Sequence, residues 1–128
     1  MAGVVLDSSV VIALLKPADK HHYVAQEAVA GSEEKVTIST ITLTEVLVRP
    51  AQLSHSACSE MADELYSHFG EPISLSSQIA IAAALVRART GLSTPDAIIS
   101  ATASVNMATL WTCDARLAKL HKGARLIA

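Results

Sequence analysis

Four acidic residues of this 128-residue chain could form one site only if the fold brings them together, namely Asp7, Glu45, Asp96 and Asp114. Three of the four come at or just beyond the carboxyl end of a predicted strand, and all four lie near the predicted start of a helix. In an open parallel sheet these points share one edge, where such proteins bind their ligands. The pattern predicts an acidic cluster assembled by tertiary structure.

A cluster of carboxylates needs a counter-charge. Two unit charges 4 Å apart repel by about 4 kcal/mol at an effective dielectric near 20. Four acids in one cleft would therefore raise one another's pKa or bind a cation. Carboxylate oxygens with retained waters suit Mg²⁺ or Mn²⁺. A metal held in this way is equipment for hydrolysing a phosphodiester.

Each acid also has an ordinary structural interpretation. Asp7 and Asp114 fit helix N-caps, and Thr42 with Glu45 fits a capping box. Asp96 would interact favourably with a helix dipole, an effect of about 0.3–1 kcal/mol. Taken singly, each acid fits capping better than catalysis. Their shared placement favours the cluster, because the other acids of the chain do not follow strands.

The elements that must position these acids follow from short apolar runs, helical periodicity and stop signals. The predicted strands are 4–6, 35–39, 72–75, 109–111 and 125–127. The predicted helices are 10–15 (with its start at 7–9), 21–30, 42–48, 54–69, 77–89, 94–106 and 114–121. Strands that alternate with helices predict parallel βαβ units. The expected fold class is α/β, a single domain over 1–128 with a short parallel sheet and helices on both faces in three layers.

Helix boundaries are predicted from capping and breaking residues. Ser77 and Thr94 are the expected N-caps of their helices, with Pro95 at the first helical position. Pro50 is expected to lie beyond the end of helix 42–48.

Composition excludes several classes of protein. The chain is 51% hydrophobic and 17% charged, which excludes disorder. Its longest apolar run, Ile79–Val86, is far shorter than the roughly 20 residues of a membrane helix. No secretory signal is visible, because residues 1–3 carry no basic side chain and Asp7 interrupts the first apolar stretch. Two cysteines form no disulfide framework. These features predict a cytoplasmic protein without a membrane contact.

Basic charge is concentrated at the carboxyl end. The net charge is −2, yet residues 115–128 contain four basic side chains and no acid, namely Arg116, Lys119, Lys122 and Arg125. This stretch is either a solvated tail or a surface that contacts phosphates. The few aromatic residues do not suffice for a base-stacking surface.

Four segments together resemble a known family. VVLDSSVVIALL resembles the opening strand and helix of a PIN-domain ribonuclease, and TLTEVL, TPDAIISATA and LWTCDARL resemble its three later acidic motifs in order. The resemblance covers essentially the whole chain and is closest to the VapC toxins of toxin–antitoxin pairs. One departure is Cys113, where the family often has Asn or another small residue.

The resemblance implies roles for individual residues. Asp7 and Asp96 would be direct ligands of Mg²⁺ or Mn²⁺, and Asp114 would complete the site directly or through water. Glu45 would orient a water or bind a second metal. A further implied set supports these acids and the substrate: hydroxyls of Ser9 and Thr112 orient the carboxylates, and Arg116 and Lys119 hold RNA phosphates.

The resemblance also implies partners, an RNA substrate, a cognate antitoxin and a second copy of the chain. Helices 54–69 and 79–89 carry more apolar side chains than one sheet face can absorb: Met61, Leu65, Phe69, Ile79, Ile81, Leu85 and Val86. The surplus predicts an exposed patch and a homodimer. The antitoxin would cover a remaining apolar groove and place a basic side chain against Asp7 and Asp96.

Two other functions fit parts of the pattern. A catalytically silent PIN-like module would bind only a partner protein, although the presence of all four acids favours an enzyme. A phospho-acceptor receiver domain would need paired acids after its first strand and an acceptor Asp after its third. Here Ser8 and Ser9 follow Asp7, and Ser76 follows Leu75, so the receiver pattern is absent.

Overall fold

The computed structural model describes residues 3–128. Two expectations include Met1 and Ala2, namely the domain 1–128 and the absence of a secretory signal, and these two residues lie outside the described ones. No helix within 3–128 is long and apolar enough to cross a membrane.

The centre of the molecule is a four-stranded, fully parallel sheet in the order β2-β1-β3-β4. The strands are β1 (Val4–Leu6), β2 (Val36–Thr37), β3 (Thr109–Thr112) and β4 (Arg125–Leu126). Because β1 and β3 are neighbours in register, with Val5 opposite Leu110, their carboxyl ends meet at one edge. The strand predicted at 35–39 is shorter in the structure, where β2 spans Val36–Thr37. The strand predicted at 72–75 is reduced to one bridge between Ile73 and Ser39.

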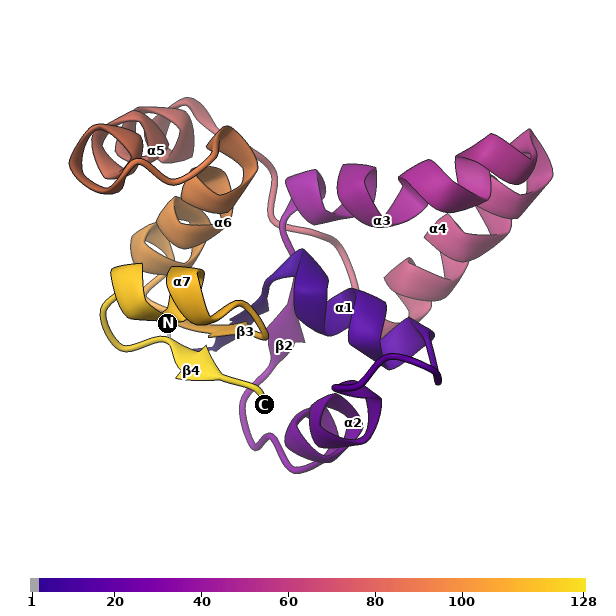
Figure 1. Cartoon of the computed structure of the whole chain (residues 1–128). Helices are drawn as coiled ribbons and strands as arrows, with labels where there is room; N and C mark the ends of the chain where they lie inside the picture. The colour runs from indigo at the N-terminus through magenta and orange to yellow at the C-terminus, as the bar shows by residue number, and fades with distance from the viewer. Residues whose placement is uncertain (1–2) are drawn as a thin grey trace.

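Helices cover both faces of this sheet (Figure 1). They are α1 (Ser8–Leu15), α2 (His22–Ala30), α3 (Thr40–Leu53), α4 (His55–Phe69), α5 (Ser77–Thr90), α6 (Thr94–Val105) and α7 (Ala115–Leu120). Successive side chains of a strand point to opposite faces. Accordingly, Val4 and Leu6 pack with α1 to α4, whereas Val5 packs with α5, α6 and α7. The predicted three-layer α/β architecture is confirmed.

Helix α3 differs most from its predicted bounds. It begins at Thr40 and continues through Pro50 to Leu53, whereas the sequence predicted 42–48. Pro50 removes only its own N–H from the helical ladder, and its carbonyl still accepts from the N–H of Ser54 at 3.1 Å. Packing against the antiparallel helix α4 (Figure 1) outweighs the local preference of proline to end a helix.

Three helices are capped one or more residues earlier than predicted. Their N-caps are Ser39, Ser76 and Ser93, whose hydroxyls accept from Ile41, Ile79 and Asp96 N–H groups. The predicted caps Ser77 and Thr94 are instead the first helical residues, and Pro95 is the second. Where two hydroxyl residues are adjacent, either one can cap, and the upstream one does so here.

Candidate active site

The four acids lie on the segments that follow β1, β2 and β3 and in the first turn of α6. Asp7 directly follows β1, and Asp114 follows the neighbouring strand β3. Asp96 is the third residue of α6, and Glu45 lies on α3. The charges of Asp7, Asp114 and Glu45 all raise the pKa of the Asp96 carboxyl, so these groups lie within electrostatic range of it. A metal site shared by the four acids stays a prediction.

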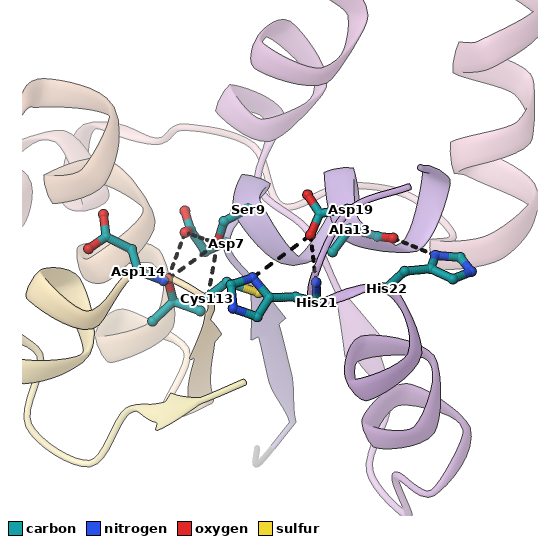
Figure 2. A network of polar contacts seen from close by, with 9 residues as sticks. Asp7, Ser9, Ala13, Asp19, His21, His22, Cys113 and Asp114 are labelled. Atoms are coloured by element: carbon teal, nitrogen blue, oxygen red, sulfur yellow. Dashed lines mark hydrogen bonds and ion pairs between the residues drawn. The ribbon is translucent and has the colours of Figure 1, made fainter. Parts of the chain in front are cut away.

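Asp7 is oriented by two hydroxyl groups. Its Oδ2 accepts hydrogen bonds from Ser9 Oγ at 2.7 Å (Figure 2) and from Thr112 Oγ1 at 2.8 Å. The side chain is only 5% exposed. Asp7 occupies the N-cap position of α1, yet its carboxylate makes no capping hydrogen bond. The N-cap interpretation therefore does not account for this acid.

Asp114 does cap its helix. Its Oδ1 accepts from the backbone N–H groups of Arg116 at 2.8 Å and Leu117 at 3.2 Å. Its own N–H donates to Thr112 Oγ1 at 3.0 Å. Thr112 thus connects Asp7 with Asp114. Because the capping bonds use Oδ1, capping and membership of the cluster are compatible for this residue.

Glu45 accepts a hydrogen bond from Ser8, a partner that the sequence did not assign to it. Ser8 Oγ donates to Glu45 Oε1 at 2.5 Å, and the Ser8 and Thr42 hydroxyl oxygens lie 3.2 Å apart. The predicted capping box is wrong, because Thr42 is buried inside α3 and Ser39 caps the helix. The spacing of Thr42 and Glu45 still carried a signal, since residues three apart share one face of a helix.

The cluster contains like charges without a basic partner. Burial raises the pKa of Asp96, and the nearby Asp7 carboxylate raises it further. A hydrogen bond with Ser93 opposes this rise, while Asp114 and Glu45 add to it. Within residues 3–128 the ion pairs are His21–Asp19 and His68–Glu64, and neither involves these four acids. Their charge is therefore not neutralised by the protein.

This donor set fits a hard divalent cation. All four side chains offer carboxylate oxygen, the ligand type of Mg²⁺ and Mn²⁺. In the described part of the chain, no three acidic, histidine or cysteine side chains converge as a ready-made metal cage. Mg²⁺ characteristically keeps several waters and binds through one or two carboxylates, so it does not need such a cage.

Other candidate residues have separate surroundings. Arg116 and Lys119 are exposed on α7, which begins beside Asp114. Burial raises the pKa of the Cys113 thiol, and its N–H donates to Ser9 Oγ at 3.0 Å. Trp111 belongs to the core, as expected, with the Arg125 guanidinium 4.5 Å from its ring centroid.

The two buried histidines have structural partners. His22 Nδ1 lies 2.7 Å from the Ala13 carbonyl oxygen (Figure 2). His121 Nδ1 lies 2.6 Å from Ser100 Oγ, and burial lowers the pKa of His121. Both hydrogen bonds join separate helical segments.

Comparison with known proteins places this geometry in a family. A family model described as PIN domain matches residues 4–123. A toxin–antitoxin complex from Klebsiella pneumoniae contains a chain with 25% identity and a TM-score of 0.81, with 98% of each chain covered. FitAcB from Neisseria gonorrhoeae matches at 20% identity and a TM-score of 0.78, with 96% of each chain covered.

A third solved structure is VapC20 from Mycobacterium tuberculosis, described as a toxin that cleaves the sarcin-ricin loop. It matches at 19% identity and a TM-score of 0.76, covering 91% of this chain and 94% of its own. A comparison with curated protein sequences found no match.

Proposed function

Because this chain belongs to the PIN-domain family, we propose that it is a metal-dependent endoribonuclease and the toxin of a toxin–antitoxin pair. The observation that carries the proposal is the cluster of Asp7, Glu45, Asp96 and Asp114, which no basic side chain within 3–128 neutralises. The similarity of the chain to one in a toxin–antitoxin complex and to a toxin that cleaves the sarcin-ricin loop supports the same function.

In this proposal the four acids have different tasks. Asp7 and Asp96 bind Mg²⁺ or Mn²⁺ directly, and Asp114 completes the site directly or through water. Glu45 orients a water molecule or binds a second metal. A bound divalent cation would supply an activated water and stabilise the negative charge that develops on the phosphodiester.

The surrounding residues hold these groups in place. Ser9 and Thr112 fix the Asp7 carboxylate, and Ser8 fixes that of Glu45. Arg116 and Lys119 bind phosphates of the RNA backbone, a contact that positions a nucleic acid without reading its sequence. Hydrolysis at this site leaves 5′-phosphate and 3′-hydroxyl ends.

An RNA cleavage assay tests this function. Wild-type protein should cut RNA with Mg²⁺ or Mn²⁺ and stop when EDTA is in excess. Asp96→Asn should be inactive, whereas Asp63→Asn, which removes the same charge from an exposed site on α4, should keep full activity. Cleavage that persists in EDTA, or cyclic phosphate ends, would contradict the mechanism. An inactive wild-type protein that still binds a partner would support the silent binding module instead.

We further propose that the antitoxin covers an apolar groove beside the acids. The groove between α1, α3 and α4 has a volume of about 270 Å³, and Ile12, Val46 and Met61 line it together with Glu45. A partner segment seated here would lie close enough to direct a basic side chain at Asp7 and Asp96. The complex should then be inactive, and Ile12→Glu should weaken it without changing cleavage by the free toxin. A complex as active as the free chain would argue against this mode of inhibition.

We also propose that the protein is cytoplasmic and forms a homodimer. The exposed apolar residues Ile81 and Leu85 of α5 support self-association.

A further inference from the structure

Arg87 is held over the connection between α5 and α6. Its Nε donates to the Leu92 carbonyl oxygen at 2.8 Å, and its Nη1 donates to Thr94 Oγ1 at 3.1 Å. A guanidinium group has five N–H donors, so three remain for another partner. The two hydrogen bonds fix the position of an exposed arginine that would otherwise be mobile.

Arg116 reaches the same connection from α7. Its Nη2 lies 3.9 Å from the position that a Cβ atom on Gly91 would occupy, which is an ordinary van der Waals distance. Gly91 has a φ of +73° and ends α5 in the left-handed conformation that glycine favours. The short connection 91–93 is thus bonded by the Arg87 guanidinium of α5 and has the Arg116 guanidinium of α7 beside it.

Within residues 3–128, neither arginine forms an ion pair with a carboxylate. Among residues 3–128, the ion pairs involve histidines and exclude both arginines. Within the same range, the causes that shift the pKa of Asp96 include three acids and no basic side chain. Arg87 and Arg116 therefore leave the acidic cluster unneutralised, and their own positive charge is available for an anion.

The position of the two arginines indicates which anion they bind. Connection 91–93 leads into the first turn of α6, which carries Asp96, and Arg116 comes two residues after Asp114. A ligand that lies at both places must present several negative charges in sequence, some to a divalent cation and some to guanidinium groups. A phosphodiester chain has this property, and arginine binds phosphate through paired N–H groups.

We propose that Arg87 and Arg116 together bind an RNA backbone phosphate next to the one at the acidic cluster. The inference rests on the proposed ribonuclease function and extends it to Arg87, a residue of α5 that lies outside the four acidic motifs. The pair sets the path of the RNA along connection 91–93 towards the acids.

The test measures RNA binding without metal, so that it does not depend on cleavage. A fluorescently labelled single-stranded RNA oligonucleotide is titrated in EDTA at several salt concentrations, with anisotropy as the readout. Each phosphate contact to a single strand contributes about 0.7 to the slope of log affinity against log salt. Because both arginines hold the same phosphate, the double variant should lose about that amount of slope, and Arg87→Ala and Arg116→Ala should each lose part of it.

Arg89→Ala is the matched control, because it removes the same charge from an exposed position two residues along α5. It should leave the slope unchanged. Arg87→Ala also removes two hydrogen bonds, so thermal melts must accompany it. Arg116→Ala removes no hydrogen bond of its side chain in the described structure, and it keeps the test valid if the Arg87 variant is unstable.

Three results would overturn the inference. Variants of Arg87 and Arg116 that keep the wild-type slope would do so, as would an Arg89→Ala variant with an equal loss. Variants that keep RNA binding but lose affinity for poly-L-glutamate would identify an acidic protein segment as the occupant. In each case, metal-dependent cleavage by the wild-type chain would leave the proposed function intact. A wild-type chain that neither cuts nor binds RNA would overturn both.

Discussion

Hydroxyl groups orient the acidic side chains of the cluster. Ser9 and Thr112 donate to Asp7, and Ser8 donates to Glu45. A hydroxyl fixes a carboxylate without adding a positive charge, whereas an arginine or lysine would neutralise it. The three hydroxyl groups therefore fix the carboxylates of Asp7 and Glu45 while both keep their negative charge. Such an arrangement disfavours the folded state of the free protein and favours binding of a cation.

The charge of Asp96 gives a prediction about stability and pH. The pKa of this carboxyl is raised by burial and by Asp7, so the folded protein holds a proton that the unfolded chain has already lost. Asp96 therefore favours folding at low pH, and this effect disappears as the pH rises from the unfolded pKa through the folded one. Asp96→Asn should be more stable than wild type at pH 7, and the gain should vanish near pH 3.

Denaturant unfolding of both proteins between pH 3 and 7 measures this difference, with the exposed Asp63→Asn as control. Cleavage by Asp96→Asn should fall by more than the roughly 10–100-fold typical of losing a residue that only supports a metal ligand. If Asp96→Asn unfolds or cleaves RNA like wild type, the acid is a structural residue of the first helical turn.

Thr112 gives a second prediction at this scale. Thr112→Val removes the donor to Asp7 and the acceptor of the Asp114 N–H while it keeps the volume of a fully buried side chain. Cleavage and Mn²⁺ affinity should fall by about 10–100-fold, and Thr112→Ser should restore both. Turnover assays and calorimetric Mn²⁺ titrations measure these effects. Equal values for the Val and Ser variants would contradict an orienting role for the hydroxyl.

At the scale of helices and strands, the local pattern of apolar and capping residues predicted most of the elements. Strand 4–6 was predictable from its continuous apolar run, and helix 54–69 from the helical spacing of its apolar residues. The continuation of α3 through Pro50 was not, since it depends on packing against α4. Strand β2 was overestimated, because only Val36 and Thr37 pair with β1.

In the candidate site, too, some residues could be predicted from the sequence, and others depend on how the helices pack. The positions of Asp7 and Asp114 could be predicted because a carboxylate at a strand end has a defined position in any parallel sheet. Ser8 and Arg87 could not be assigned partners, because their contacts depend on how helices pack. Ser8 meets Glu45 across two helices, and Arg87 meets Thr94 across a turn whose path is set by Gly91.

The end of α6 gives a prediction about stability. Met107 adopts a φ of +53° in a turn where its N–H donates to Ser104 and the Ala108 N–H donates to Ala103. This is the position where helices usually carry glycine. Left-handed backbone costs other residues about 1–2 kcal/mol, and glycine loses part of that gain through its greater freedom when unfolded.

Met107→Gly should therefore raise the free energy of unfolding by about 0.5–1 kcal/mol, because the Met107 side chain is 72% exposed and loses little packing. Met107→Ala should bring no such gain, since alanine keeps the backbone strain. Denaturant titration compares the three proteins. A gain in the alanine variant as large as in the glycine variant would show that the side chain, not the backbone, is unfavourable.

Across the whole molecule, the acidic cluster and the exposed apolar residues Ile81 and Leu85 of α5 lie in different places. Asp7 and Asp114 follow the carboxyl ends of β1 and β3, whereas α5 lies at the outside of the fold (Figure 1). Of the apolar residues expected to exceed the capacity of the core, most are buried or half-buried. Ile81 and Leu85 are the exceptions, at 66% and 65% exposed. They lie four residues apart, so they share one face of α5.

This face leads to a prediction about assembly. If α5 mediates self-association, light scattering at micromolar concentration should give twice the 13.4 kDa mass of one chain. Leu85→Glu should yield a monomer, because a dimer related by twofold symmetry would place two carboxylates in the same apolar contact. Leu53→Glu makes the same change at a residue 83% exposed on α3 and should leave the dimer intact. A monomeric wild-type chain would contradict the dimer, and a dimeric Leu85→Glu variant would assign the contact to another surface. Because Leu85 is not among the residues assigned to metal or RNA, the monomeric variant should still cleave RNA.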